Sequence, residues 1–360
     1  MGEPVAVDVE ERVDADAGPL GAPDAAEPAE PAEPAEPAEP APVRRLDVAP
    51  WQTQAAVRAV EPLVVRRHAR KALDELREAH PSRAAGAYLS RLDRLIDADQ
   101  LDLPPFPDVA QELDGLLKET NTDILQIARV VERDPGLVRR VWRQARSALY
   151  ASPPRSLHHA VARVGLDALW RIGMSVCLND TVLRVDGFQD EAGELRSLGI
   201  ATAEVAAQLG GEKRGNLYMS GLLHDVGRLL VLRAAGEVGE KPDMALIRAA
   251  QDRVGAALAV LVVETWGLDE AVAVGVGFSA SVDAAPTRYA RVSKVVRAAS
   301  IAAHAAALQR QGFELDAFDP VGEINGLGFG GQSALDRADE VLGQLGGPGS
   351  SGEGQAAASG

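Results

Sequence analysis

The chain has 360 residues; 46% are hydrophobic and 25% are charged, a balance typical of globular proteins that excludes wholesale disorder. Aromatic residues make up only 4%, so Ala, Val, Leu and Ile must fill the core, which favours helices over a large sandwich of sheets. The net charge is −16, but twelve acids and one base in residues 1–43 account for −11 of it. The chain shows no basic excess of the kind that a phosphate-backbone binder needs, so nucleic acid is not an expected partner.

The N-terminal segment, residues 1–45, is predicted to be a disordered acidic tail. Residues 26–40 are five successive Ala-Glu-Pro triplets. Proline at every third position removes amide donors and restricts the preceding residue, so neither a helix nor a strand can form. We interpret this tail as a solubilising spacer, with a docking arm for a basic partner as the alternative. Residues 349–360, rich in Gly, Ser and Ala, are likewise predicted to be disordered.

No segment of the sequence has the character of a membrane span or an export signal. No apolar run approaches the roughly 20 residues that span a bilayer. The N-terminus is acidic and lacks a basic region followed by an apolar one. We therefore expect a cytoplasmic location and no membrane insertion.

Between the tails almost every segment has helical spacing, which predicts an all-α protein. Residues 46–100 are expected to form a small helical extension with a helix start near Pro62. Asp123, Asp134 and Ser156 are typical N-cap residues, and Gly165 is a typical stop. Later helices are predicted at 195–209, 217–232, 244–266, 270–276 and 288–308. A C-terminal segment, 311–348, is predicted to be partly helical, with a flexible stretch at 326–331.

The one local string that suggests chemistry is Gly-Leu-Leu-His-Asp-Val-Gly at 221–227. An imidazole next to a carboxylate, here His224 and Asp225, can ligate a metal ion or share a hydrogen bond. Because the flanking residues are apolar, the pair is expected to face a packed interior. We favour a structural pair, with Asp225 bonding His224 or capping an adjacent helix. A remnant pocket that binds a nucleotide or an ion is the alternative.

A series of short motifs surrounds this string. They are 103–107 (Leu-Pro-Pro-Phe-Pro), 134–137 (Asp-Pro-Gly-Leu), 145–150 (Ala-Arg-Ser-Ala-Leu-Tyr), 156–165 (beginning Ser-Leu-His-His-Ala-Val and ending in Gly), 254–256 (Val-Gly-Ala) and 265–268 (Thr-Trp-Gly-Leu). In this order they resemble the HDOD domain, a bacterial output-type relative of the HD-family metal phosphohydrolases, with Arg146 where that family usually has Asn. We therefore expect an HDOD-like domain over 101–310. The resemblance implies a role in bacterial signal transduction through protein contacts.

The sequence departs from catalytic HD proteins at their metal ligands. Those enzymes need several His and Asp side chains around one or two metal ions that activate water against a phosphoester. When this sequence is placed on the family pattern without gaps, four of the usual ligand positions hold other residues. These are Leu198, Gln251, Ser279 with Ala280, and Ser300. Of the six histidines, only His304 is left as a downstream companion for His224. We expect no metal, no cofactor and no catalytic residue, and we interpret His224 and Asp225 as a vestigial pocket.

Four arginines, Arg139, Arg140, Arg143 and Arg146, are predicted to give one helix a basic side. This side is interpreted either as a solvated surface or as a face for an acidic partner. Three hypotheses for the function stay open. We favour a non-catalytic signalling or scaffold protein with protein partners; the others are a metal-dependent phosphohydrolase with a reduced ligand set and a nucleotide-sensing pseudoenzyme.

Overall fold

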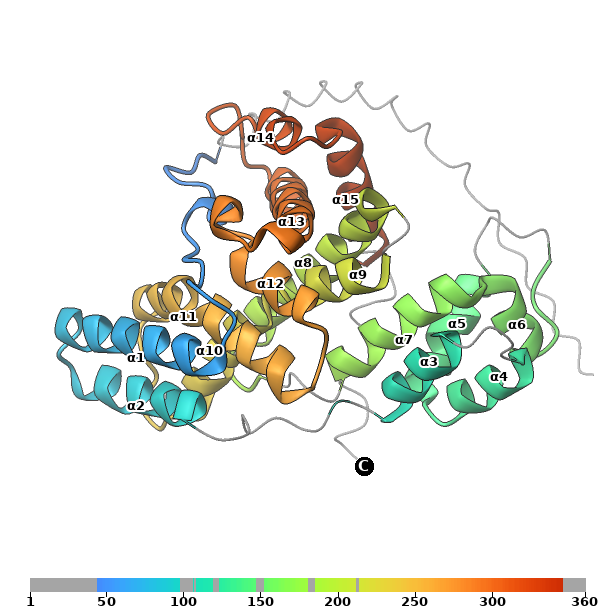
Figure 1. The fold of residues 1–360 in the computed structure, drawn as a ribbon, viewed down its shortest axis with the longest axis horizontal. Helices are drawn as coiled ribbons and strands as arrows, with labels where there is room; N and C mark the ends of the chain where they lie inside the picture. The colour runs from blue at the N-terminus through green and yellow to red at the C-terminus, as the bar shows by residue number, and fades with distance from the viewer. Residues whose placement is uncertain are drawn as a thin grey trace, which may run out of the picture. The chain divides into compact units, whose positions relative to one another are not determined.

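The computed structural model describes residues 44–97, 106, 108–118, 123–146, 152–180, 185–211 and 214–345. The predictions for the tails therefore lie outside the described residues, apart from Arg44 and Arg45. All regular elements in the described ranges are helices (Figure 1), so the all-α prediction is confirmed. The β-type pairing found among these residues is an isolated bridge between Arg44 and Phe313.

The helices follow one another along the chain without an intervening strand in the described ranges. They are η1 (Pro50–Gln52), α1 (Pro62–Ala79), α2 (Arg83–Asp97), α3 (Asp108–Lys118), α4 (Ile124–Glu132), α5 (Pro135–Ala145), α6 (Leu157–Val164), α7 (Leu166–Asp180), α8 (Gln189–Gly210), α9 (Arg214–Leu223), α10 (Val226–Gly236), α11 (Met244–Thr265), α12 (Glu270–Phe278), η2 (Val282–Ala284), η3 (Thr287–Tyr289), α13 (Ala290–Arg310), α14 (Pro320–Gly326) and α15 (Gly331–Leu345).

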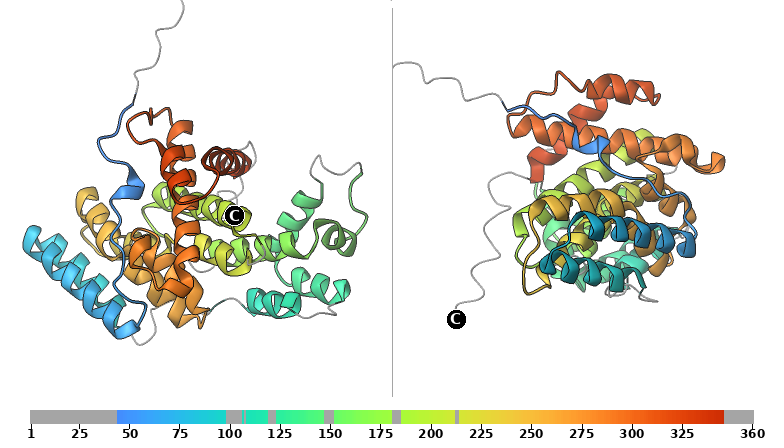
Figure 2. Two further views of the ribbon diagram at one scale, coloured as in Figure 1. Left: turned by 45° about the horizontal axis from the view of Figure 1, so that its top comes forward. Right: turned by 90° about the vertical axis from the view of Figure 1, so that its left-hand side faces the viewer.

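Three main groups of buried apolar side chains hold these helices together. The first joins α1 and α2 to α10, α11 and α12. The second lies between α8, α13, α14 and α15 and includes Trp51. The third lies within α3–α7. Because α1 packs on α11 (Figure 2), the N-terminal helical extension shares its core with the later helices.

Several helix starts are built as their sequence predicts. The side chains of Asp123, Asp134 and Ser156 accept hydrogen bonds from the backbone N–H groups of Leu125, Leu137 and His159, at 3.0, 3.0 and 3.1 Å. Each side-chain oxygen thereby satisfies one of the N–H groups that a helix start leaves unpaired. Gly165 ends α6 with a φ of 80°, a conformation that favours glycine.

The single helix predicted at 217–232 is wrong, because the chain breaks at His224 and Asp225 into α9 and α10. Gly221 in α9 and Gly227 in α10 lie on either side of the break. A Cβ on Gly221 would lie 2.7 Å from the Ala203 Cα, and one on Gly227 would lie 1.9 Å from the Gly255 carbonyl oxygen. The backbone of α9 therefore approaches that of α8 closely, and the backbone of α10 approaches that of α11. The apolar periodicity of the sequence continues through the break.

The C-terminal segment is more regular than its glycine content predicts. The stretch 326–331 comprises the last residue of α14, a short connection and the first residue of α15, and its flexibility stays a prediction. Gly331 is buried, and its N–H donates a hydrogen bond of 2.9 Å to the Asn325 Oδ1. Glycine is required there because a Cβ would lie 2.4 Å from the Val321 carbonyl oxygen.

Candidate functional site

A buried cluster of two histidines and one aspartate lies at the junction of α9 and α10. His224 and Asp225 come from the break between these helices, and His304 comes from α13, eighty positions along the chain. Their exposed fractions are 4%, 2% and 4%. The packing of α13 on α8, α9 and α12 brings the third member to the first two.

The two imidazoles are held in the same manner. Nδ1 of His224 donates to the Gly221 carbonyl oxygen at 2.7 Å, and Nδ1 of His304 donates to the Ser300 carbonyl oxygen at 2.8 Å. A carbonyl only accepts, so each Nδ1 carries a proton and each Nε2 points elsewhere. The His224 and His304 Nε2 atoms lie 3.1 and 4.0 Å from Asp225 Oδ2. These three atoms have no hydrogen-bond partner of good geometry among the described residues.

The electrostatics of the cluster follow from burial and from its charges. Burial alone would raise the pKa of the Asp225 carboxyl, but the positive charges of His224 and Arg228 outweigh it and hold this pKa well below its usual range. Burial lowers the pKa of His304 to about 4, against the opposing effect of Asp225. At neutral pH the cluster therefore contains an ionised carboxylate beside a neutral His304.

Polar groups of the same chain surround the Asp225 carboxylate. Its Oδ1 lies 3.7 Å from an Arg228 guanidinium nitrogen and accepts a hydrogen bond of 3.4 Å from the Gln54 side-chain amide. The α10 helix begins directly after Asp225, but the Asp225 side chain does not cap it. The atoms of the predicted hydrogen bond between Asp225 and His224 lie 3.1 Å apart but without hydrogen-bond geometry, and the predicted cap is absent.

The residues at the places of the family's metal ligands do not fit a metal centre. Gln251 donates to the Arg228 carbonyl oxygen at 3.3 Å. Ser279 and Ser300 are buried hydroxyls, and neither is a typical ligand. In the part of the chain that the structure describes, no group of three or more His, Cys, Asp or Glu side chains is arranged to hold a metal ion.

The four predicted arginines form an outward-facing patch on α5. At about 100° per residue, Arg139, Arg143 and Arg146 share one stripe opposite the buried face of this helix, and Arg140 lies to its side. The three stripe arginines are exposed and Arg140 is half-buried. None of the four has an ion-pair partner within the described ranges; Arg146 lies 5.2 Å from the centre of the Trp142 ring.

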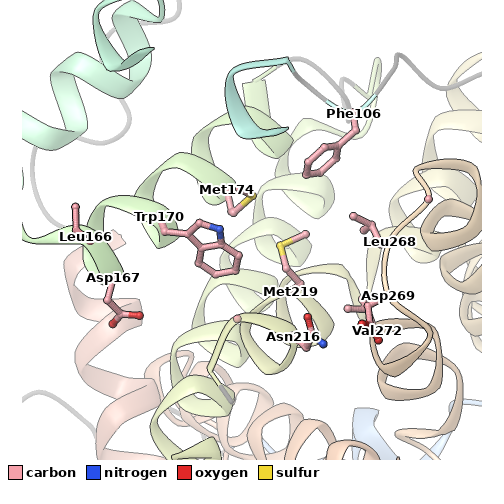
Figure 3. A pocket seen from close by; sticks show the side chains of 12 residues that line it. Phe106, Leu166, Asp167, Trp170, Met174, Asn216, Met219, Leu268, Asp269 and Val272 are labelled. Atoms are coloured by element: carbon pink, nitrogen blue, oxygen red, sulfur yellow. The ribbon is translucent and has the colours of Figure 1, made fainter. Parts of the chain in front are cut away.

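A separate cavity of about 500 Å³ lies between α7, α9 and the start of α12 (Figure 3). Trp170, Met174, Met219 and Phe106 point toward one another in it (Figure 3). The Asp269 carboxylate at its edge accepts a hydrogen bond from the Ala271 N–H at 2.7 Å, as the cap of α12. The cavity suits an apolar group, and the sequence contains no local motif that predicts it.

The fold is a set of packed helices whose buried cluster includes the His-Asp step at 224–225. The sequence profile of the HDOD domain matches residues 103–282, half of the chain. The chain therefore belongs to the HDOD family. No protein with a curated description matches the sequence.

Two solved structures share the fold at low sequence identity. One is a "Putative metal-dependent phosphohydrolase" from Shewanella amazonensis SB2B, with 20% identity, a TM-score of 0.52 and coverage of 71% of this chain and 97% of that one. The other is an HDOD domain protein of unknown function from Geobacter sulfurreducens, with 21% identity, a TM-score of 0.51 and coverage of 72% and 93%. At these identities the likeness establishes the fold alone. No helix among the described residues is long and apolar enough to cross a membrane.

Sequence reasoning missed two contributors to the cluster. Arg228 lies one turn after His224, where its contact with Asp225 depends on the break between α9 and α10. Gln54 is 171 positions away from Asp225 and belongs to no motif. The only sequence signal near Gln54 is Trp51, one of four tryptophans in a chain with few aromatic residues.

Proposed function

We propose that this HDOD protein is a non-catalytic signal-transduction or scaffold protein that acts through protein–protein contacts. The observation that carries the proposal is the surroundings of the Asp225 carboxylate. Its two oxygens face His224, His304, Arg228 and Gln54, all from the same chain. A phosphohydrolase would instead use carboxylates and imidazoles to hold one or two metal ions and to orient a water molecule.

The first test compares the purified protein with His224→Ala, and uses His158→Ala, an exposed histidine, as the control. We expect all three to contain well below one equivalent of transition metal by plasma mass spectrometry. We also expect equal background turnover of bis(p-nitrophenyl) phosphate. A stoichiometric metal ion and turnover that are both lost only in His224→Ala would establish the phosphohydrolase instead. A thermal shift with a cyclic dinucleotide that His224→Ala abolishes would favour the nucleotide sensor.

The arginine stripe on α5 is the surface that we propose for the contact. Residues 123–165 contain eight basic and three acidic residues, although the whole chain carries −16. Two of these acids, Asp123 and Asp134, are used as helix caps. Exposed guanidinium groups that have no ion-pair partner among the described residues, spread over about 10 Å of helix, fit a partner that presents carboxylates. Complementary charges steer association and fix its register.

The second test reverses the charge of the stripe with Arg139→Glu, Arg143→Glu and Arg146→Glu. The control reverses Arg67, Arg248 and Arg291, which are exposed on other helices, so both variants have the same net charge. We expect cross-linking in native cells to capture a partner protein with the wild type and with the control. The amount of this partner that the stripe variant captures should be at least tenfold lower. Equal capture by both variants would contradict the proposal, and capture that nuclease abolishes would identify nucleic acid as the partner.

A further inference from the structure

The segment before α1 contacts the His224, Asp225 and His304 cluster through Gln54. We call residues 44–57 the strap. Figure 1 shows it in blue, passing from α14 beside α13 and α12 to the start of α1. Apart from the short η1 turn it has no regular structure, so its position depends on the contacts that its side chains and amides make with the helices.

Two buried side chains anchor the strap, one near its middle and one at its C-terminal end. Near the middle, Trp51 is 1% exposed and lies edge-on to Phe318, with ring centres 6.1 Å apart. Its indole N–H donates to the Glu323 Oε1 at 3.4 Å. At the C-terminal end, Val57 is 3% exposed, and its N–H donates to the Gly277 carbonyl oxygen at 3.0 Å.

The groove under the second anchor is complementary to it. A Cβ on Gly277 would lie 2.7 Å from a methyl carbon of Val57. The missing side chain of Gly277 therefore makes the room that Val57 fills. The anchors belong to two different apolar clusters, Trp51 to that of α13–α15 and Val57 to that of α11 and α12.

Between the anchors the strap is held by polar contacts. The Gln54 amide donates to the Asp225 Oδ1 at 3.4 Å, and the Ala55 N–H donates to the Asp252 carbonyl oxygen at 2.8 Å. Gln54 is half-buried and Thr53 is exposed, whereas Asp225 behind them is 2% exposed. Gln54 is thus the strap residue that contacts the cluster, and it lies between the buried Asp225 and solvent.

We infer that the strap is an intramolecular ligand in a peptide groove, and that the groove binds the same kind of segment in trans when the strap leaves. Such a segment is extended and carries an aromatic anchor, a side-chain amide donor for Asp225 and a small apolar residue at Gly277. Departure of the strap also opens the cluster to solvent. This inference stands on the strap contacts alone and holds whether or not the α5 stripe is a partner surface.

The test uses the full chain with Trp51→Ala, Gln54→Ala and Val57→Ala combined, and Arg58→Ala, an exposed neighbour, as the control. Diethylpyrocarbonate modifies accessible imidazoles, and mass spectrometry maps them; exposed His158 is the internal reference. We expect His224 and His304 to react at least tenfold faster in the triple variant than in the wild type or the control. A synthetic peptide of residues 49–58 should bind the triple variant, slow this reaction again, and leave the wild type unbound.

A further measurement, hydrogen exchange, tests whether the triple variant stays folded. Hydrogen exchange of the α11 amides is expected to stay slow in the triple variant, since α11 is packed on α1, α10 and α12 rather than on the strap alone. Unchanged histidine reactivity, or an increase that occurs only together with fast exchange in α11, would overturn the inference. Equal binding of the peptide to wild type and variant would also overturn it, because the peptide would then occupy another site.

Discussion

At the scale of single residues, the geometry of the cluster is set by the two imidazole Nδ1 protons. Nδ1 of His224 and of His304 are fixed as donors by the Gly221 and Ser300 carbonyl oxygens. At neutral pH His304 is uncharged, so its Nε2 is an acceptor, 4.0 Å from Asp225 Oδ2. The positive side chain of Arg228 lies on the other side of the carboxylate. The cluster is therefore stable as an ionised aspartate among cationic and dipolar neighbours, and protonation of His304 is opposed by burial.

The lowered pKa of His304 predicts a loss of stability in mild acid. Its pKa is about 4 in the folded protein and 6.5 in the unfolded chain. Between these values the unfolded chain binds a proton that the folded chain does not, so the free energy of unfolding falls as the pH falls from 6.5 to 4. We expect a loss on the order of 2–3 kcal/mol in urea unfolding between pH 7 and pH 4.5, and a smaller loss for His304→Gln.

The exposed His158 provides the matched control for this prediction. His158→Gln should keep the wild-type dependence on pH. Asp225, whose pKa is lowered, contributes its own loss only below about pH 4, outside the window that is measured. An identical pH dependence in His304→Gln and wild type would contradict the assignment.

At the scale of helices, glycines decide how closely α9, α10 and α11 approach one another. Gly227 lets α10 meet the backbone of α11, where a Cβ would lie 1.9 Å from the Gly255 carbonyl oxygen and 2.8 Å from the Ala259 N. Gly86 in α2 is also helical, but no atom lies within 4 Å of its Cβ position, and it is exposed. Replacing either glycine with alanine would raise the helix propensity by the same amount. The added Cβ would be free of contacts at Gly86 but would collide with the backbone of α11 at Gly227.

Alanine substitutions at these two glycines are expected to act in opposite directions. Gly86→Ala should stabilise the protein by about 0.5–1 kcal/mol, because alanine loses less backbone entropy than glycine in a helix. Gly227→Ala should destabilise it by about 3 kcal/mol or more, because α10 and α11 must move apart and their packing is lost. Urea unfolding measures both, and a neutral Gly227→Ala would contradict the backbone contact.

At the scale of the whole molecule, the described fold extends beyond the residues that match the HDOD profile. The match ends at residue 282, whereas His304 lies in α13, which packs on α8, α9 and α12. On the other side, α1 packs on α11. The buried face of α13 is rich in alanine and continues the core, so its removal would expose apolar surface of α8 and α12.

A fragment of residues 103–282 is therefore expected not to fold cooperatively, although it contains the complete family match. A fragment of residues 44–345 should melt in one cooperative transition with near-native circular dichroism. The shorter fragment should show a broad transition and bind a dye such as anilinonaphthalene sulfonate. A sharp transition of the shorter fragment would contradict the role assigned to α1 and α13.

The sequence alone determined the helical class, the caps at Asp123, Asp134 and Ser156, and the family, because these depend on periodicity and on contacts within a few residues of the chain. The presence of Gln251 and Ser300 where the resemblance places metal ligands was also readable there, as an expectation. Only the tertiary structure decided the break at His224, the approach of His304 and the course of the strap. These arise where helices distant along the chain pack at backbone contact, and no local pattern records which of them meet.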